Sequence, residues 1–285
     1  MSTVPYNVIA ASKPFRFLVG PSKKEFFIHS ELVAQASKPL WILVNGEWKE
    51  GKEGVVEWSE VDEETFSRFC EFAYTGNYHA AEPIHDTPSA LLGIEEKPSS
   101  EEVIEASSTA ESRLEREPED QWSTWATSTK VKKKGIKSGI SKKDTMLEAF
   151  RTGDRECILP EVPTSNLNPS TDYSEVLLSH THLYAFADCY DIEKLMILCV
   201  RKLRAQLILF NLHGGARAND IAQLIDYSYK NTRSESFMQD NLRSMLSTYV
   251  ACHIEELWSN VYFQDVLGSG EVSRDIIGKL LKRLD

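Results

Sequence analysis

Histidine has the widest chemistry of any residue type in this chain, and two of its seven copies are separated by a single residue. His180 and His182 lie in an apolar stretch with helical periodicity. Imidazole nitrogens bind transition metals and transfer protons near neutral pH. However, positions i and i+2 of a helix do not share a face, and no set of carboxylates or cysteines completes a tetrahedral site around them. The pair therefore predicts no metal site.

Motifs for phosphate binding and nucleophilic catalysis are absent as well. The sequence holds no P-loop, no GxGxxG and no GxSxG. Two glycines occur in HGGAR, but no strand precedes them, so this connector is not expected to cradle a phosphate. We therefore expect no enzyme, no cofactor and no small-molecule substrate.

The five cysteines are odd in number, widely spaced and without a CxxC pair, so a disulfide framework is not expected. Four of them lie in apolar helical patterns and are expected to be buried free thiols: Cys70, Cys189, Cys199 and Cys252.

Charge and hydropathy narrow the class of protein. The net charge of −11 argues against a nucleic-acid binder, which needs a basic face. No run of 18 apolar residues and no secretory signal occurs, so we expect no membrane insertion and a cytoplasmic or nuclear location. The lysines of 130–143 are interpreted either as a nuclear-import signal or as a solvated basic block opposite the acidic residues of 81–120.

The elements that must position any site begin with alternating apolar residues. Phe15, Phe17 and Val19 have a strand period, a Gly-Pro-Ser turn follows, and EFFIHS completes a hairpin. Ser30 is placed to cap a helix over 31–37, which Pro39 limits. A third strand is predicted at 55–58, and a helix after Asp62 is predicted to stop at Thr75-Gly76-Asn77.

The composition changes after Tyr78. Residues 79–174 are rich in Ser and Glu and poor in large apolar side chains, so most of this segment cannot offset its chain entropy by burial. Two stretches differ from their surroundings, QWSTWATS and TMLEAFRTGDRECILP, and the second has the composition of a helix. From about Tyr173 onward, apolar residues recur at helical spacing to the end of the chain.

Three blocks, in this order, resemble the BTB/POZ domain family: FRFLVGPSKKEFFIHSELVAQAS, then EWKEGKEGVVEWSEVDEETFSRFCEFAYTGNY, then HLYAFADCYDIEKLMILCVRKL. The later LIDYSYKNT resembles the helical tail of fungal single-BTB proteins. The resemblance implies an α+β chain, with a BTB/POZ fold of a small three-stranded mixed sheet flanked by helices. A long disordered insertion interrupts this fold, and an all-helical extension follows it. The implied domains are 12–79 plus 175–208, the insertion 80–174, and the helical region 209–285.

The resemblance also implies a function in binding other proteins, by self-association or hetero-association. Homodimerisation is one form of it, although only eleven residues precede Ser12, where many dimeric members carry a further strand and helix. His29 is implied to be a packed, hydrogen-bonded residue where the hairpin meets the first helix.

Docking onto a cullin scaffold, as an adaptor of a ubiquitin ligase, is a second implied function. Cullin-binding members of the family carry a hydrophobic-x-Glu motif just before the third strand, and Trp48-Lys49-Glu50 occupies that segment here. An exposed indole beside a carboxylate makes a credible binding hot spot. The alternative is that Trp48 covers the edge of its own domain and Glu50 is solvated.

A third function is that of a transcription-related scaffold whose insertion carries linear motifs. Trp122 and Trp125 are aromatic residues isolated in a polar segment, and such residues often anchor a partner. The competing interpretations are that they are unconstrained residues in a tether or that they fold back on the helical domain.

In the two-part domain, Tyr78 interrupts the fold, and the helix before it is expected to pack against HLYAFADCYDIEKL after a detour of roughly 95 residues. Deletion of about residues 85–170 is therefore expected to leave a folded core.

Overall fold

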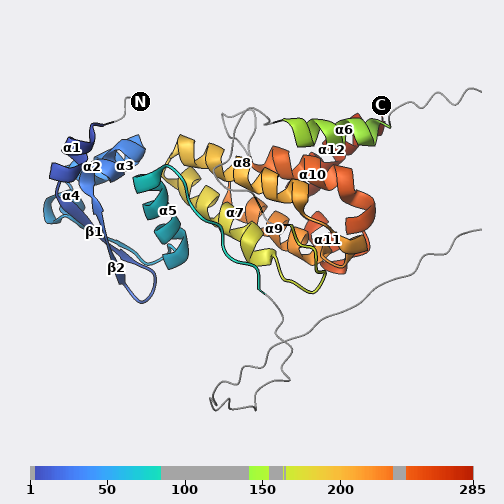
Figure 1. The fold of residues 1–285 in the computed structure, drawn as a ribbon, viewed down its shortest axis with the longest axis horizontal. Helices are drawn as coiled ribbons and strands as arrows, with labels where there is room; N and C mark the ends of the chain where they lie inside the picture. Colours follow the sequence, from blue (N-terminus) through green and yellow to red (C-terminus); the bar gives the residue numbers. More distant parts are fainter. Residues whose placement is uncertain (1–3, 85–140, 154–162, 164, 234–241, 285) are drawn as a thin grey trace, which may run out of the picture. The chain divides into compact units, whose positions relative to one another are not determined.

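The structure is a computed structural model that describes residues 4–84, 141–153, 163, 165–233 and 242–284. Within these residues the chain is α+β, and one three-stranded mixed sheet is accompanied by many helices (Figure 1). The elements before the long gap are α1 (Tyr6–Ala11), β1 (Pro14–Val19), β2 (Lys24–His29), α2 (Ser30–Ala36), α3 (Lys38–Asn45), α4 (Lys49–Glu53), β3 (Val55–Trp58) and α5 (Glu63–Thr75).

The elements after the gap are all helical. They are α6 (Lys142–Thr152), α7 (Ser174–Cys189), α8 (Glu193–Leu209), the short 3-10 helix η1 (His213–Gly215), α9 (Ala218–Asn231), α10 (Leu242–Leu257), α11 (Val261–Leu267) and α12 (Gly270–Leu284). No described helix has both the length and the apolar composition needed to cross a bilayer.

The sheet has β1 at its centre, antiparallel to β2 and parallel to β3. Phe17 is opposite Phe26 on one side and Val56 on the other. Phe15, Phe17 and Val19 are buried while Arg16 is exposed, so the predicted alternation is confirmed. This small mixed sheet is the one that the sequence analysis expected.

Helix α5 has the limits that its sequence predicts. The Asp62 carboxylate accepts a hydrogen bond from the Thr65 amide at 2.8 Å, which satisfies one of the free donors of the first turn. Gly76 ends the helix with a φ of 74°, a left-handed conformation that costs glycine little. Phe66 and Phe69 are buried on its inner face.

The prediction that Ser30 caps the helix at 31–37 is wrong. Helix α2 begins at Ser30 itself, and no side chain caps it. Instead, Ser12 Oγ accepts a hydrogen bond of 3.4 Å from the Glu31 amide. Pro39 does more than limit α2, because it stands in the first turn of α3, where the Ser37 hydroxyl accepts from the Leu40 amide.

Helix α5 packs against α7, as predicted, and aromatic side chains make much of the contact between the two parts of the chain. The Phe186 ring of α7 lies 5.0 Å from that of Phe69, and Tyr190 stacks on Trp58 with centroids 4.5 Å apart. Tyr78 is fully buried, and its Oη shares a 2.6 Å hydrogen bond with His180 Nδ1. The Lys202 ammonium donates to the Tyr78 carbonyl and lies 4.6 Å from the centre of the Tyr78 ring. Tyr78 therefore lies inside the core.

The helices after α8 share this core. Leu207, Phe210 and Leu212, which flank the expected boundary at 208–209, are buried in the same hydrophobic cluster as the sheet. Helix α9 packs on α7, and α10 packs on α8. Region 209–285 thus extends the first set of helices.

The expected limits of the disordered insertion, 80–174, need correction at both ends. Residues 80–84 lie beside α7, where the Ala81 amide donates to Ser179 Oγ, and Ile84 forms an antiparallel bridge with Asp172. Helix α6 buries Phe150, and Asn166 is buried with its amide bonded to the Asn211 carbonyl at 2.8 Å. The average composition of 80–174 is polar, so it did not indicate that single residues such as Phe150 and Asn166 are buried against the helices. Residues 85–140, 154–162 and 164 lie outside the described residues.

We predict that Tyr78→Phe lowers the free energy of unfolding by about 1–3 kcal/mol, because it leaves the buried His180 nitrogen without its hydrogen bond. Urea unfolding measures this change. Tyr6→Phe is the matched control, since Tyr6 is exposed and should change nothing. Equal stability of the two variants would show that the buried hydrogen bond is not needed.

We predict that replacing residues 90–136 by a Gly/Ser linker of about 20 residues leaves the melting temperature unchanged within a few degrees, because loop closure depends weakly on length. Deleting 85–170 also removes the Phe150 and Asn166 contacts, and it should lower the melting temperature by roughly 5 °C or more. Calorimetry compares the two. An equal loss in both would place essential contacts inside 90–136.

Candidate functional site

Trp48 and Glu50 lie where the chain enters α4, just before β3. Trp48 is the residue before the helix and is 71% exposed, whereas Glu50 is in the first turn and is half-buried. Gly54 ends α4 in a left-handed conformation, and its amide donates to the Glu50 carbonyl. The structure therefore places the indole and the carboxylate at one short helix, two residues apart, with the indole in solvent.

Gly46 determines how closely Trp48 lies to the preceding helix. A Cβ at position 46 would lie 2.3 Å from the Ile42 carbonyl oxygen and 3.0 Å from Trp48 Cδ1. Only a residue without a side chain fits there, so the chain turns tightly and the indole is held next to the end of α3. The position of the indole thus has a structural cause in Gly46.

Helix α3 adds further apolar surface. Leu40 and Val44 point into the core, and the side chains left outside include Trp41, which is 55% exposed, and Ile42, which is 41% exposed. We call Trp41, Ile42, Trp48 and Glu50 the α3–α4 surface. Trp41 and Ile42 were not predicted as surface residues, because PLWILV is apolar at every position and has no period that separates inner from outer residues.

The other predicted binding residues are outside this surface. Trp122 and Trp125 lie outside the described residues, as does most of the lysine block 130–143. Of the lysines of that block, Lys142 and Lys143 are described, and Lys143 pairs with Glu255 at 2.9 Å.

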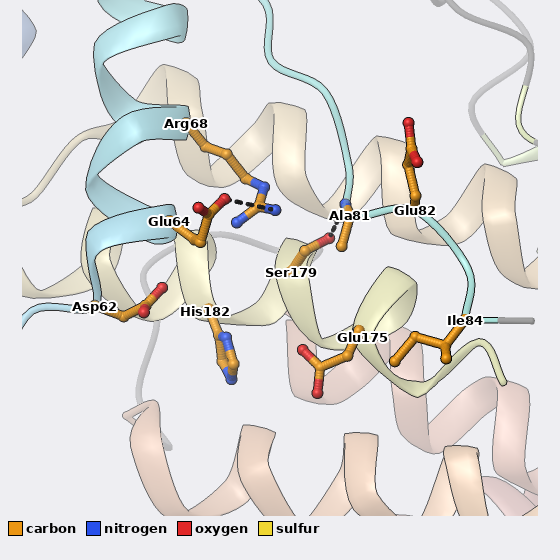
Figure 2. Close-up of a pocket in the computed structure, with 9 residues that line it drawn as sticks. All are labelled: Asp62, Glu64, Arg68, Ala81, Glu82, Ile84, Glu175, Ser179 and His182. Atoms are coloured by element: carbon orange, nitrogen blue, oxygen red, sulfur yellow. Dashed lines mark hydrogen bonds and ion pairs between the residues drawn. The ribbon is translucent and has the colours of Figure 1, made fainter. Parts of the chain in front are cut away.

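A pocket of about 400 Å³ lies between α5, residues 81–84 and α7, and Figure 2 shows its lining. The lining residues are Asp62, Glu64, Arg68, Ala81, Glu82, Ile84, Glu175, Ser179 and His182. They come from three segments that are distant in the sequence, so no local motif predicts this pocket.

Carboxylates dominate the pocket. Four of its side chains are acidic and one is an arginine. The charge of Arg68 is already paired within the fold. Its Nε donates to the His79 carbonyl at 3.1 Å, and its Nη2 lies 3.7 Å from Glu64 of the same pocket. Asp62 is used as the cap of α5. The pocket therefore presents an acidic surface to solvent.

The pocket does not assemble a catalytic group from its histidine and serine. Ser179 Oγ donates to the Val176 carbonyl and accepts from the Ala81 amide, so both roles of this hydroxyl are taken within the fold. The His182 ring packs on Tyr227 with centroids 4.4 Å apart, and burial lowers the pKa of His182 below its usual value.

His180 and His182 lie on different faces of α7, as their spacing predicts. His180 is buried against Tyr78, and burial, with smaller contributions from Lys202 and Arg68, lowers its pKa to about 3. It is therefore a neutral imidazole at physiological pH. Among the described residues, no group of three His, Cys, Asp or Glu side chains has the arrangement of a metal site.

The structure confirms the expectations for His29 and for some of the cysteines, but not for Cys189. His29 is hydrogen-bonded through Nδ1 to Tyr74 Oη at 2.9 Å at the hairpin–helix junction, as expected. Cys199 and Cys252 are buried, Cys70 is partly buried, and burial raises the pKa of both Cys70 and Cys199 to about 12. Cys189 is exposed, so its predicted burial is wrong. It is the last residue of α7, where the helix leaves the core.

Comparison with known proteins does not assign the chain to a family. No protein-family model matches it, and no curated protein is similar to it at a significant level.

We predict that His180 makes the protein less stable as the pH falls. The native state keeps this imidazole neutral down to about pH 3, whereas the unfolded chain binds a proton near pH 6.5. Between about pH 7.5 and about pH 5, the free energy of unfolding should fall by roughly 2 kcal/mol through this residue alone.

Urea unfolding at the two pH values measures the effect, and His180→Asn, which retains a neutral acceptor, should reduce the difference. A residual dependence is expected from His182 and His253, because burial lowers the pKa of these residues as well. An unchanged pH dependence in His180→Asn would contradict the assignment.

Proposed function

We propose that this chain is a protein-interaction protein of the BTB/POZ type and that its α3–α4 surface binds another protein. The observation that carries the proposal is the exposure of Trp48, 71% of whose surface remains in water on an otherwise folded helix pair. Tryptophan is the residue type that most often dominates a protein–protein interface. Three large apolar side chains on one helix and the turn after it provide the area that an interface core needs.

The energetics favour binding over a role within the fold. A tryptophan that loses most of its water contact buries on the order of 150 Å² of apolar surface, which contributes roughly 3–4 kcal/mol. Trp48 obtains little of this within the chain, because 71% of its surface stays exposed. A partner that covers it gains this contribution.

The chemistry beside the indole supports a cullin scaffold as the partner. The α3–α4 surface has a hydrophobic residue followed two positions later by a glutamate, just before β3, which is the placement that the family resemblance implies for cullin docking. An indole supplies area, and a carboxylate on the first turn of a helix supplies an oriented acceptor for a partner's donor. Self-association through the same surface is the alternative that the experiment must separate. The third expectation, linear motifs at Trp122 and Trp125, falls outside the described residues and stays a prediction.

We predict that the purified protein binds a cullin N-terminal domain in calorimetry and that Trp48→Ala weakens this binding at least about 10-fold, as loss of a hot-spot aromatic does. Glu50→Ala should weaken it less, because this carboxylate is already half-buried at the helix start. Trp258→Ala is the matched control: Trp258 is 56% exposed but follows α10, outside the α3–α4 surface.

Each result has a defined meaning. Equal heat from the parent and Trp48→Ala would exclude the motif as the docking site. No heat from the parent would exclude a cullin, and sedimentation would then decide between the remaining interpretations. Self-association that Trp48→Ala abolishes keeps the α3–α4 surface as an interface between copies, whereas a parent protein that is monomeric at all concentrations overturns the use of this surface for self-association.

A further inference from the structure

Helix α6 contacts the rest of the protein along one narrow stripe. Its less exposed face consists of Lys143, Met146, Leu147 and Phe150, at positions i, i+3, i+4 and i+7, and Phe150 is the one residue of α6 that is fully buried. The residues between them are exposed. This spacing is the pattern by which a short amphipathic helix lies in a groove of another protein.

The surface under α6 comes from three helices, and Figure 1 shows α6 beside α10 and α12. The Phe150 ring lies 5.7 Å from the Tyr249 ring of α10, and the Arg204 guanidinium of α8 lies 5.7 Å above it. Two turns earlier, Lys143 pairs with Glu255 of α10, a carboxylate that also binds Arg283 of α12. We call this surface the α6 groove, formed by Arg204, Tyr249, Glu255 and Arg283.

The α6 groove contains a buried hydroxyl group. Tyr249 is 1% exposed, and its hydroxyl has no hydrogen-bond partner among the described residues. A buried hydroxyl without a partner destabilises the arrangement that buries it.

The contacts between α6 and the groove are also expected to contribute little free energy of binding. A helix of 11 residues is marginal in isolation, so its folding depends on the groove. The Lys143–Glu255 pair is largely exposed, and such pairs contribute little in water. Binding of α6 therefore rests mainly on the Phe150 ring.

The connections of α6 permit it to leave. Fifty-six residues separate Ile84 from Ser141, and nine separate Gly153 from Pro163, the next described residue. A chain of that shorter length spans at most about 30 Å. The covalent connections on both sides of α6 are therefore long enough for the helix to move off the groove.

We propose that α6 is an intramolecular ligand of the α6 groove, and that its release opens the groove to a partner's amphipathic helix with the same chemistry. That helix carries an aromatic anchor that inserts between Tyr249 and Arg204, and a basic residue two turns earlier that pairs with Glu255. While α6 is docked it competes with the partner helix, so the affinity for the partner depends on the fraction of molecules in which α6 is released.

A labelled peptide of residues 141–153 is the probe, and fluorescence anisotropy with the full-length protein is the measurement. The Phe150→Ala protein should bind this peptide at least about 10-fold more tightly than the parent does, because its own helix no longer competes. A peptide that carries Phe150→Ala should bind neither protein. Equal binding of the parent peptide to both proteins, or binding to neither, would overturn the proposal.

Hydrogen exchange gives a second readout on the same proteins. In Phe150→Ala, the amides of residues 142–152 should exchange at least about 10-fold faster, while those of α10 keep their protection. Thr145→Ala, an exposed change on the same helix, is the control and should leave both unchanged. Unchanged protection of α6 in Phe150→Ala would show that the ring does not hold it.

Lys143→Glu covers the case in which Phe150→Ala does not fold. This change touches no fully buried group and places two carboxylates where an ion pair stood. It should also bind the peptide more tightly than the parent does, and equal binding counts against the proposal. The α6 groove and the α3–α4 surface share no residue, so failure here leaves the proposed function untouched.

Discussion

The whole structure depends on the burial of Tyr78. This residue follows α5 in the N-terminal part of the described chain, and it contacts residues that follow more than 100 positions later: His180, Cys199 and Lys202. Aromatic side chains of the sheet and α5 pack against α7 and the residue that follows it, through Phe186 and Tyr190. Neither part has a complete core alone, so the two parts must fold together.

The environment of Tyr78 also explains why the polar groups at this junction are tolerated. A buried ammonium is costly unless it is hydrogen-bonded, and Lys202 is 6% exposed. Its bond to the Tyr78 carbonyl and its position over the Tyr78 ring supply the compensation. Burial is the main reason that His180 stays neutral. The positive charge of Lys202 adds to it, because it disfavours a second positive charge nearby. One tyrosine therefore satisfies a histidine through its side chain and a lysine through its backbone.

Local chemistry determined which features the sequence could predict. The strands, the Asp62 cap and the Gly76 stop are set by neighbours within a few residues, and all were predictable. Helix α3 was not predicted, because Pro39 was interpreted as a terminator when it stands in a first turn. The structured ends of 80–174 were missed since single residues such as Phe150 and Asn166 dock into sites built by distant helices. Trp48 was found from its motif, whereas Trp41 required the knowledge of which face of α3 is covered.

The stability of the core depends little on the number of residues between Ile84 and Asp172, because both ends of this stretch have contacts of their own. Ile84 is paired with Asp172, and Asp172 is held by the Arg217 guanidinium at 2.9 Å, so the outgoing and returning chains are fixed next to each other by their own contacts. Loop-closure entropy then grows with the logarithm of the intervening length, and each doubling costs only about 0.6 kcal/mol. The length of the chain between these anchors can therefore change at little cost to the fold as long as Phe150 and Asn166 keep their contacts with the helices. A substitution on the α3–α4 surface therefore leaves the contacts that fix these two anchors unchanged.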